Sequence, residues 1–504
     1  MELPGTYNAA VDLVERNLAA GRGGRTAYID DSGTTTYAQL AERVDRAANA
    51  LRGLGLKREQ RVAIAMLDSA DWVALFLGAI KAGIVPVALN TLLTRADYEY
   101  QLKDSRARAL FISQALFKNF EGMQARCPHL KYLINDLQLK DLLATADAKA
   151  DAAVTLRDEM CFWLYSSGST GAPKGTVHLH SHLIETADLY AKPVLGIRES
   201  DVVFSAAKLF FAYGLGNALT FPLAVGATTI LMAERPTPDS VFKRLTEGKP
   251  TIFYGVPTLY AALLANPAFP KKEQLALRVC TSAGEALPPE ILKRWTERTG
   301  AELLDGIGST EMLHIFLSNR PGDVRPGTTG KAVPGYQLRL VDDQGNVVTK
   351  PGELGELQIG GPTSAIMYWN QREKTKGTFQ GPWTRSGDKY SVDKDGYYVY
   401  GGRSDDMLKV SGIYVSPVEV EAALITHEAV LEAAVVGAQD ENKLVKPKAY
   451  VVLKQGNTGN EELKSRLQQH VKDKLAPYKY PRWIEFLPEL PKTATGKIQR
   501  FKLR

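Results

Sequence analysis

Short apolar runs alternate with helix-like stretches along most of the chain. Apolar runs at 60–66, 84–90 and 108–113 are separated by amphipathic or apolar helical segments at 69–83 and 94–105. Strands interleaved with helices of this length favour right-handed crossover connections and a parallel sheet. The same alternation returns in short apolar runs at 162–165, 202–205, 227–232, 251–254 and 278–283. The pattern therefore predicts an α/β protein with two doubly wound layers.

The pattern changes twice towards the C-terminus. From about residue 331, apolar and polar positions alternate with dense Gly and Pro up to residue 361, which predicts an antiparallel β-rich subdomain. Beyond 401–406 the predicted order is helix, strand, strand, helix, strand, at 417–426, 432–437, 448–453, 460–475 and 482–486. We therefore expect a large N-terminal domain over residues 1–402 and a small, mobile α+β domain over residues 403–504.

Composition and charge exclude several classes of protein. The chain has 504 residues, of which 44% are hydrophobic and 23% charged, as in an ordinary globular protein. Its 62 basic against 56 acidic residues leave a net charge of +6, without the basic blocks typical of a nucleic-acid partner. The three cysteines form no CxxC pair, and the acidic residues within the first twenty positions lead us to expect no secretory leader. No run of eighteen apolar residues suggests a membrane span. We expect a cytoplasmic protein that binds anionic small molecules and no membrane.

A segment rich in hydroxyl groups and glycine follows the apolar strand at 162–165. Hydroxyl and backbone N–H groups bind phosphate oxygens, and a lysine adds a positive charge. Lys174 follows a proline and precedes a glycine, so the segment does not match the GxxxxGK[ST] loop of NTPases. It predicts a different phosphate loop, whose candidate residues are Ser166, Ser167, Gly168, Ser169, Thr170 and Lys174.

A second glycine-containing segment spans residues 305–311. It fails as a dinucleotide fingerprint, because Glu311 stands at the third glycine position. A carboxylate beside a phosphate site is chemically reasonable as a Mg²⁺ ligand, although a segment of this kind, taken alone, is more often a capped turn than a site. Three more polar motifs follow at 383–388, 401–406 and 491–497.

Taken together and in this order, the motifs resemble those of the adenylate-forming superfamily, which contains acyl-CoA synthetases, peptide-synthetase adenylation domains and firefly luciferase. The resemblance spans nearly the whole chain and implies that ATP, Mg²⁺ and coenzyme A take part. On this resemblance, Thr170 and Glu311 are expected to hold Mg²⁺. The ATP-binding residues implied are those of the phosphate loop together with Ala283, Gly284, Glu285, Asp305, Gly306, Ile307, Thr310, Asp388 and Arg403.

Two of these expectations concern particular chemistry. Asp388 matches the carboxylate that accepts both ribose hydroxyls, with Arg403 as its partner. An aromatic residue that often stacks on adenine in this superfamily is replaced by Ile307, which leaves the base less tightly sandwiched.

The resemblance also assigns roles in the small domain. Lys497 matches the lysine that bridges the acyl carboxylate and the α-phosphate during adenylation, which is electrostatic catalysis. Asp405 matches the hinge about which the domain turns between two half-reactions. After that turn, Lys409 would contact the acyl carbonyl, and the loop that opens the thiol channel would contain Ser411, Gly412 and Tyr414.

The acyl pocket is expected to hold a flat aromatic ring, because small residues lie beside aromatic ones. Segments at 208–222, 305–319, 408–417 and 446–452 closely resemble the benzoate–CoA ligase branch of the superfamily. The substrate-binding residues implied are Ala206, Phe211, Ala212, Tyr213, Gly214, Gly308, His314 and Ile315. An apolar Ile315 at the para corner disfavours 4-hydroxybenzoate, because a buried phenol without a partner loses about 1–3 kcal/mol. His314 is equally well explained as a structural histidine.

The alternatives are a ligase for 4-hydroxybenzoate or another substituted benzoate, an enzyme that loads a carrier protein or makes an amide, and a non-catalytic nucleotide-binding protein. We expect an acid–thiol ligase with an aromatic carboxylate as its small-molecule partner, either a monomer or a homodimer. His178, His180 and His182 alternate in sequence, but no carboxylate or cysteine lies among them, so we interpret them as a strand-to-helix junction and not a metal site.

Overall fold

The computed structural model describes residues 3–166, 173–410, 413–441, 444–492 and 498–504. One sheet has the strand order β18-β8-β7-β4-β3-β5-β6, and its central strands β7, β4, β3, β5 and β6 run parallel. Its strands are β3 (Arg61–Ala65), β4 (Val85–Ala88), β5 (Ala109–Ile112), β6 (Tyr132–Asn135), β7 (Met160–Ser166), β8 (Lys174–Leu179) and β18 (Met367–Tyr368). Its connecting helices include α3 (Ala70–Lys81), α4 (Arg95–Ser105), α5 (Met123–Arg126) and α6 (Asp136–Thr145).

A second sheet has the strand order β15-β14-β13-β12-β11-β9-β10-β1-β2, with a parallel centre from β13 to β1. Its strands are β1 (Thr26–Asp30), β2 (Gly33–Thr36), β9 (Val202–Ser205), β10 (Thr228–Ile230), β11 (Ile252–Gly255), β12 (Val279–Ser282), β13 (Glu302–Gly308), β14 (Ile315–Ser318) and β15 (Lys331–Ala332). Helices α10 (Pro238–Glu247), α11 (Pro257–Ala265) and α12 (Pro289–Thr299) connect strands of this sheet.

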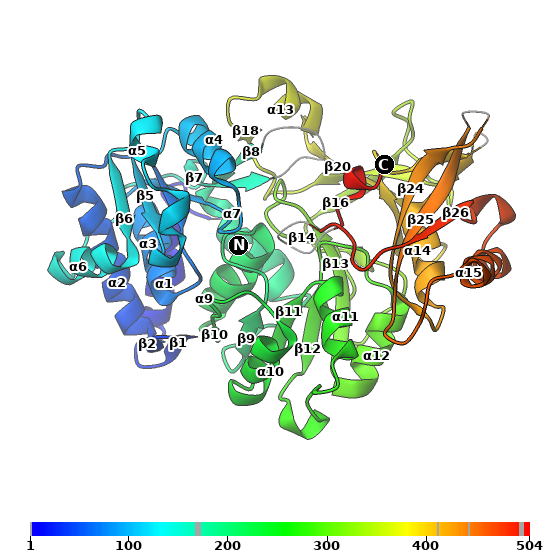
Figure 1. Ribbon diagram of the computed structural model, residues 1–504. Helices are drawn as coiled ribbons and strands as arrows, with labels where there is room; N and C mark the ends of the chain where they lie inside the picture. Colours follow the sequence, from blue (N-terminus) through cyan, green and yellow to red (C-terminus); the bar gives the residue numbers. More distant parts are fainter. Residues whose placement is uncertain (1–2, 167–172, 411–412, 442–443, 493–497) are drawn as a thin grey trace.

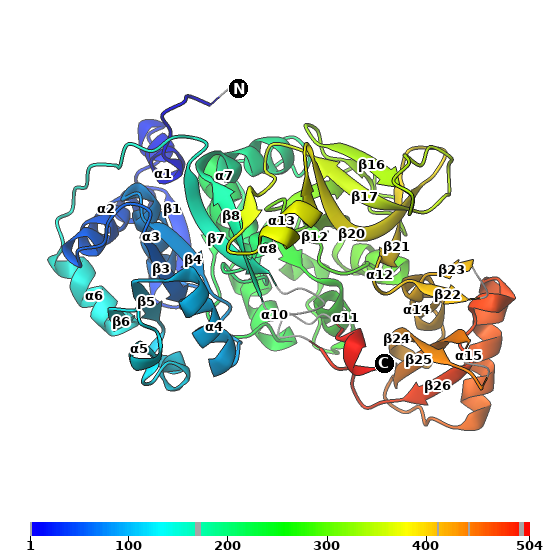
Figure 2. The ribbon, with the colours of Figure 1, turned by 90° about the horizontal axis from the view of Figure 1, so that it is seen from above.

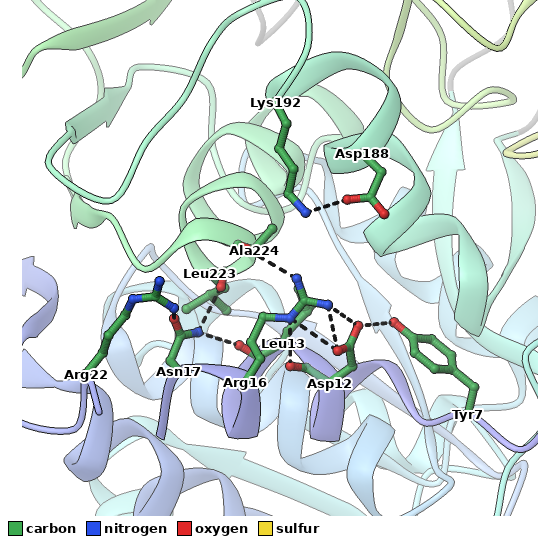
Figure 3. A network of polar contacts seen from close by, with 10 residues as sticks. All are labelled: Tyr7, Asp12, Leu13, Arg16, Asn17, Arg22, Asp188, Lys192, Leu223 and Ala224. Atoms are coloured by element: carbon green, nitrogen blue, oxygen red, sulfur yellow. Dashed lines mark hydrogen bonds and ion pairs between the residues drawn. The ribbon is translucent and has the colours of Figure 1, made fainter. Parts of the chain in front are cut away.

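Several helices share one apolar core with strands of both sheets. They include α1 (Ala9–Ala19), α2 (Tyr37–Gly53), α7 (His180–Thr186), α8 (Ala212–Leu215) and α9 (Phe221–Val225), with a π-helical stretch at Gly216–Thr220 between α8 and α9. Figure 3 shows how α1 meets α9: Arg16 donates to the carbonyl of Ala224 at 3.2 Å, and Asn17 donates to that of Leu223 at 2.8 Å. Tyr7 in turn donates to Asp12 at 2.6 Å. These bonds satisfy carbonyl groups at the end of α9.

An antiparallel unit follows the second sheet. Its strands are β16 (Gln337–Val341), β17 (Gly355–Gly360), β19 (Phe379–Gln380), β20 (Trp383–Val392) and β21 (Tyr398–Arg403), with helix α13 (Arg372–Thr378) before β19. Strand β20 pairs with β17, β19 and β21, all antiparallel. This unit is the predicted β-rich subdomain.

The C-terminal elements form a unit with its own apolar core. Strands β24 (Val430–Gln439) and β25 (Val445–Leu453) pair antiparallel, and β26 (Trp483–Phe486) adds a parallel edge. Helices α14 (Pro417–Ile425) and α15 (Glu461–Lys474) and the hairpin β22 (Leu408–Val410) with β23 (Ile413–Val415) complete it. In Figures 1 and 2 this orange-to-red unit lies at the opposite end of the molecule from the blue N-terminal helices.

The predicted fold class is confirmed, with three differences in detail. The sheets are mixed, because β8, β18, β14, β15 and β2 join their edges antiparallel. Strand β13 runs to Gly308, into the glycine-containing segment at 305–311, because it pairs with β14 as well as β12. The hairpin β22–β23 was not predicted. In the part of the chain that the structure describes, no helix is long and apolar enough to cross a membrane.

Candidate active site

Predicted site residues gather at one edge of the second sheet. Strands β9, β11, β12 and β13 are parallel neighbours in this sheet, so their carboxyl ends meet at the same edge. Ala206 follows β9, Ala283 to Glu285 follow β12, and Asp305 pairs with Ser282 across the β12–β13 ladder. Ligands of open α/β sheets bind beyond the carboxyl ends of the strands. The topology thus brings predicted substrate-binding and ATP-binding residues to the same edge of the sheet.

A polar cluster brings both candidate phosphate segments together. Lys174 at the start of β8 lies 3.6 Å from Oε1 of Glu311, and the hydroxyl of Ser166 at the end of β7 donates to the same oxygen at 3.4 Å. The hydroxyl of Tyr368 donates to Oε1 at 2.6 Å. The ammonium of Lys174 lies 3.1 Å from the Tyr368 hydroxyl and 4.2 Å from the centre of its ring.

The electrostatics of this cluster keep Glu311 ionised. Burial acts to raise the pKa of the Glu311 carboxyl, but the Lys174 charge and the Tyr368 hydrogen bond oppose it, and the net pKa lies below its usual value. An ionised carboxylate and a hydroxyl are hard oxygen ligands, which suit Mg²⁺. No group of three or more His, Cys, Asp or Glu side chains in the described ranges is placed to hold a metal. The Glu311 carboxylate would suit a cation that takes further oxygen ligands from substrate phosphates.

A second polar cluster surrounds Asp388 on β20. Arg403 at the end of β21 donates to Oδ1 of Asp388 at 3.2 Å and to the carbonyl of Ser386 at 3.0 Å. Tyr400 donates to the same Oδ1 at 3.4 Å. Gly387, at φ +71°, allows this approach, because a Cβ there would lie 2.8 Å from a nitrogen of Arg403. The cluster fixes the orientation of the carboxylate that the resemblance assigns to the ribose hydroxyls.

Buried hydroxyls connect this cluster to Asp305. The Tyr390 hydroxyl lies 3.2 Å from Oγ1 of Thr329, and Thr329 hydrogen-bonds to the Asp305 carboxyl. Burial raises the pKa of Asp305 well above its usual value, and the Thr329 bond only partly offsets it. The charge of Arg403 also acts on the pKa of Tyr368, which burial raises first and Glu311 second. The charged groups around Asp305, Asp388 and Glu311 are therefore close enough to affect one another's neighbours electrostatically.

The predicted acyl segments also meet. The hydroxyls of Tyr213 on α8 and Thr281 on β12 lie 2.5 Å apart. Nε2 of His314 lies 3.1 Å from Oδ1 of Asn217 and 3.2 Å from the carbonyl of Tyr213. Burial lowers the pKa of His314 to about 3, so the imidazole is neutral at physiological pH. These contacts and the burial suit a structural histidine, and a role of His314 in the acyl pocket stays a prediction.

Two glycines are required for this packing. A Cβ on Gly216 would lie 2.3 Å from Cδ2 of His314, and a Cβ on Gly308 would lie 2.5 Å from the His314 carbonyl oxygen. Any side chain at either position would push the His314 segment away. Of the other predicted pocket residues, Ala206, Ala212 and Ile315 are buried, Gly214 lies in α8, and Phe211 precedes that helix.

The three histidines lie where the junction was predicted. His178 is on β8, and His180 and His182 are in the first turn of α7. Nδ1 of His178 lies 3.0 Å from Nδ1 of His182, and its Nε2 donates to the carbonyl of Thr310 at 2.8 Å. Burial lowers the pKa of all three imidazoles. His178 therefore braces the Thr310–Glu311 turn from inside the core, which its sequence position did not indicate.

Part of the predicted site lies outside the described residues, namely Ser167, Gly168, Ser169, Thr170, Ser411, Gly412 and Lys497. Lys409 pairs with Tyr414 across the β22–β23 ladder, and Asp405 lies in the turn between β21 and β22. Ile307 is on β13 and Gly284 has a φ of +93° in the turn after β12.

Five residues whose side chains contact predicted site residues were not predicted from the sequence: Tyr368, Tyr400, Asn217, Thr281 and Thr329. Tyr400 lies three residues before Arg403, so nearness to a motif was the available signal for it. Tyr368 stands in an ordinary loop sequence and Asn217 in an apolar helix, so no sequence motif marked either residue.

Comparisons with known proteins support the family that the sequence resembles. Residues 15–369 match the family described as AMP-binding enzyme, and residues 419–497 match the AMP-binding enzyme C-terminal domain. The chain is 64% identical to a benzoate–CoA ligase of Thauera aromatica, over 100% of this chain and 97% of that protein. It is 50% identical to a 4-hydroxybenzoate–CoA/benzoate–CoA ligase of Rhodopseudomonas palustris, over 99% and 94%.

Solved structures give the same result. A benzoate CoA ligase from Burkholderia xenovorans LB400 superposes with a TM-score of 0.93 at 57% identity, over 99% of this chain and 100% of that chain. The anthranilate CoA ligase AuaEII, in complex with anthranoyl-AMP, superposes with a TM-score of 0.96 at 46% identity, over 100% and 98%. Fold and site thus define an AMP-forming acid–thiol ligase. The chain belongs to the AMP-binding enzyme family, and the resemblance to adenylate-forming acyl-CoA synthetases is confirmed.

Proposed function

We propose that the protein is a benzoate–CoA ligase. In the first half-reaction a benzoate oxygen attacks the α-phosphorus of ATP, which forms benzoyl-AMP and releases pyrophosphate. In the second, the CoA thiolate attacks the acyl carbon, which forms the thioester and releases AMP. The observation that carries the proposal is the full-length likeness to the Thauera enzyme, which is named for this activity.

The first half-reaction needs charge to be neutralised around a triphosphate. Lys174, the cation beside Glu311, would pair with phosphate oxygens, and Asp388, held by Arg403, would offer its carboxylate to the ribose hydroxyls. A Mg²⁺ ion beside Glu311 would offset phosphate charge when bound with the nucleotide. Lys497 would stabilise the negative charge that develops as the acyl and phosphoryl groups join.

The second half-reaction needs a new group at the same site. We propose that residues 403–504 turn as a body about Asp405, which brings Lys409 and the loop with Ser411, Gly412 and Tyr414 towards the adenylate. Support comes from the separate apolar core of the C-terminal unit and from the short turn that joins β21 to β22. The hinge uses backbone torsions, so the core of neither part has to open.

The residues of the predicted ring pocket favour an unsubstituted aromatic acid. Ile315 and Ala212 are buried and apolar, and the imidazole of His314 is neutral. The Rhodopseudomonas relative is named for both 4-hydroxybenzoate and benzoate, so 4-hydroxybenzoate is the second candidate.

Pyrophosphate release tests the proposal directly. The purified protein is supplied with ATP, Mg²⁺ and one of benzoate, 4-hydroxybenzoate, 3-hydroxybenzoate or anthranilate, with and without CoA. We expect the highest kcat/KM with benzoate and formation of benzoyl-CoA and AMP only when CoA is present. A preference for a substituted ring would replace benzoate as the substrate, and no pyrophosphate from any acid would leave a nucleotide-binding protein without the chemistry.

A further inference from the structure

Tyr368 is held in place by a rigid frame on both sides. It ends β18, which pairs with β8, and it is only 3% exposed. Its backbone N–H donates to Oγ1 of Thr375 at 3.0 Å, and the next residue, Trp369, donates its backbone N–H to the carbonyl of Gly175 at 2.7 Å. The ring therefore has a defined position relative to Lys174, which lies next to Gly175 on the paired strand.

The neighbour of Tyr368 ties the same strand end to α4. The indole of Trp369 donates to the carbonyl of Asp104 at 3.1 Å and packs on Trp163 with ring centres 4.6 Å apart. The Tyr165 hydroxyl donates to the Asp104 carboxylate at 2.7 Å. These contacts come from β7 and α4, so the first sheet and not a surface loop sets where Tyr368 points.

The Tyr368 side chain contacts both charged groups of the phosphate cluster. Its hydroxyl donates to Oε1 of Glu311 at 2.6 Å, the shortest of the contacts given above for that oxygen. Lys174 donates to the Tyr368 oxygen at 3.1 Å, and its ammonium also lies over the ring face. The hydroxyl is thus both donor and acceptor, and it joins the carboxylate to the lysine.

We propose that Tyr368 is a positioning residue for the nucleotide-bound cation. It restrains Oε1 of Glu311 and so sets the direction in which the second oxygen, Oε2, is presented to Mg²⁺. When nucleotide binds, Lys174 exchanges its contact with Glu311 for a phosphate oxygen, and the Tyr368 hydroxyl keeps the carboxylate oriented through that exchange. This inference rests on the proposed function, since it assumes that ATP and Mg²⁺ enter this cluster.

Substitution of Tyr368 by Phe tests the role, because it removes one oxygen and keeps the ring beneath Lys174. The quantity measured is the ratio of the ATP Kd in EDTA to the Kd in Mg²⁺, by calorimetry in the absence of any acid. We expect this ratio to fall about tenfold in Y368F, the scale of a hydrogen bond to a charged group. The Mg²⁺ concentration that half-saturates pyrophosphate release should rise by a similar factor.

The matched control is Y37F. Tyr37 on α2 is fully buried and donates to the carbonyl of Ala227 at 2.7 Å, so its loss also removes a buried hydroxyl. We expect Y37F to keep the wild-type Kd ratio. A Y368F ratio within twofold of wild type and Y37F would overturn the proposal.

A double variant separates positioning from a general structural effect. If Tyr368 acts through Glu311, then Y368F should lower the Kd ratio no further in an E311Q background. Equal losses from Y368F in both backgrounds would overturn the proposal. Because these binding measurements contain no acid, a wild-type protein that fails to release pyrophosphate with benzoate would contradict the proposed function and leave this result standing.

Discussion

Nε2 of His314 and Oδ1 of Asn217 lie 3.1 Å apart, although 97 positions separate them in the chain. Both oxygens near Nε2, those of Asn217 and Tyr213, are acceptors, so Nε2 carries the proton of a neutral ring. Nδ1 has no hydrogen-bond partner within the described part of the chain. The imidazole is therefore held in one orientation, and we expect selectivity between benzoate and its ring-substituted analogues to depend on the neighbouring Ile315.

Substitution of Ile315 by Thr should shift the preference towards 4-hydroxybenzoate. A hydroxyl at this buried position would offer the phenol a partner, worth about 1–3 kcal/mol or roughly tenfold in relative kcat/KM. The measurement is kcat/KM for the two acids by pyrophosphate release. Ile315→Val, which shortens the chain without adding a polar atom, is the control. An equal change in both variants would attribute the effect to space alone.

Replacing Asp388 by Asn should weaken ATP binding. The amide keeps the shape but loses the charge that pairs with Arg403 and that we propose receives the two ribose hydroxyls. We expect the KM for ATP to rise about 10- to 100-fold, with the KM for benzoate changed much less. Asp395→Asn, at an exposed turn paired with Arg325, is the control. Unchanged ATP kinetics would contradict the assignment of Asp388 to the ribose.

Lys497→Ala should separate the two half-reactions. If this amine neutralises charge only during adenylation, pyrophosphate release from benzoate and ATP should be abolished, while supplied benzoyl-AMP is still converted to benzoyl-CoA. Lys502→Ala, at an exposed position in the same C-terminal segment, serves as the control. Equal loss of both half-reactions would show that Lys497 has no role specific to adenylation.

Asp405→Pro should block the turn between the half-reactions. Proline fixes φ near −65° and would restrict the backbone at the proposed hinge. We expect one half-reaction, measured separately, to persist while overall turnover falls at least tenfold. Asp405→Ala, which leaves the backbone free, should retain most of the overall turnover. Normal turnover in the proline variant would exclude a hinge at this position.

Buried histidines should make stability sensitive to acid, and His180 allows a direct test. Burial lowers the pKa of His180 to about 4 from the ordinary 6.5, so between these values the folded state binds fewer protons than the unfolded state. The free energy of unfolding therefore falls as pH decreases through this window, by about 3 kcal/mol for this group. In its neutral form, Nδ1 of His180 accepts the backbone N–H of Ala9 at 3.2 Å.

His180→Asn keeps an acceptor and cannot be protonated. We expect the variant to lose less stability than the wild type between pH 7 and pH 4.5, measured as the shift of the urea midpoint. The variant and the wild type must be compared at the same pH values, because two carboxyl groups have the opposite effect. Burial raises the pKa of Glu185 to about 7 and that of Asp68 to about 6, and both shifts increase the free energy of unfolding as pH decreases. His129→Asn, at an exposed position, is the control. Parallel pH curves for wild type and H180N would refute the expectation.

Much of the fold followed from local pattern. Apolar runs of strand length separated by helices predicted the parallel centres of both sheets, because strands buried on two faces must be continuously apolar. The antiparallel edges were not predicted. Strand β8 begins at Lys174, the last candidate residue of the phosphate loop, and pairs antiparallel with β7. Such a pairing depends on which edge of the sheet is open. The β22–β23 hairpin was too short to show a period of its own.

The charged residues of the candidate site were predicted from their motifs, but the residues that hold them in position were not. Glu311, Lys174, Asp388 and Arg403 stand in motifs whose residue types carry the chemistry, and the structure brings them together in pairs. Tyr368 contacts Glu311 across 57 positions, and it lies in a segment without any chemical signature.

The amino-acid order by itself determined the α/β class, the phosphate-binding chemistry and the family, because strand periodicity and motif residues are local properties of the chain. Only the tertiary structure decided that Tyr368 joins Glu311 to Lys174 and that Asn217 holds His314. Those contacts depend on how β18 docks on β8 and how the helix containing Asn217 packs against the segment before β14. Such packing is set by burial over the whole molecule, and no short stretch of sequence encodes it.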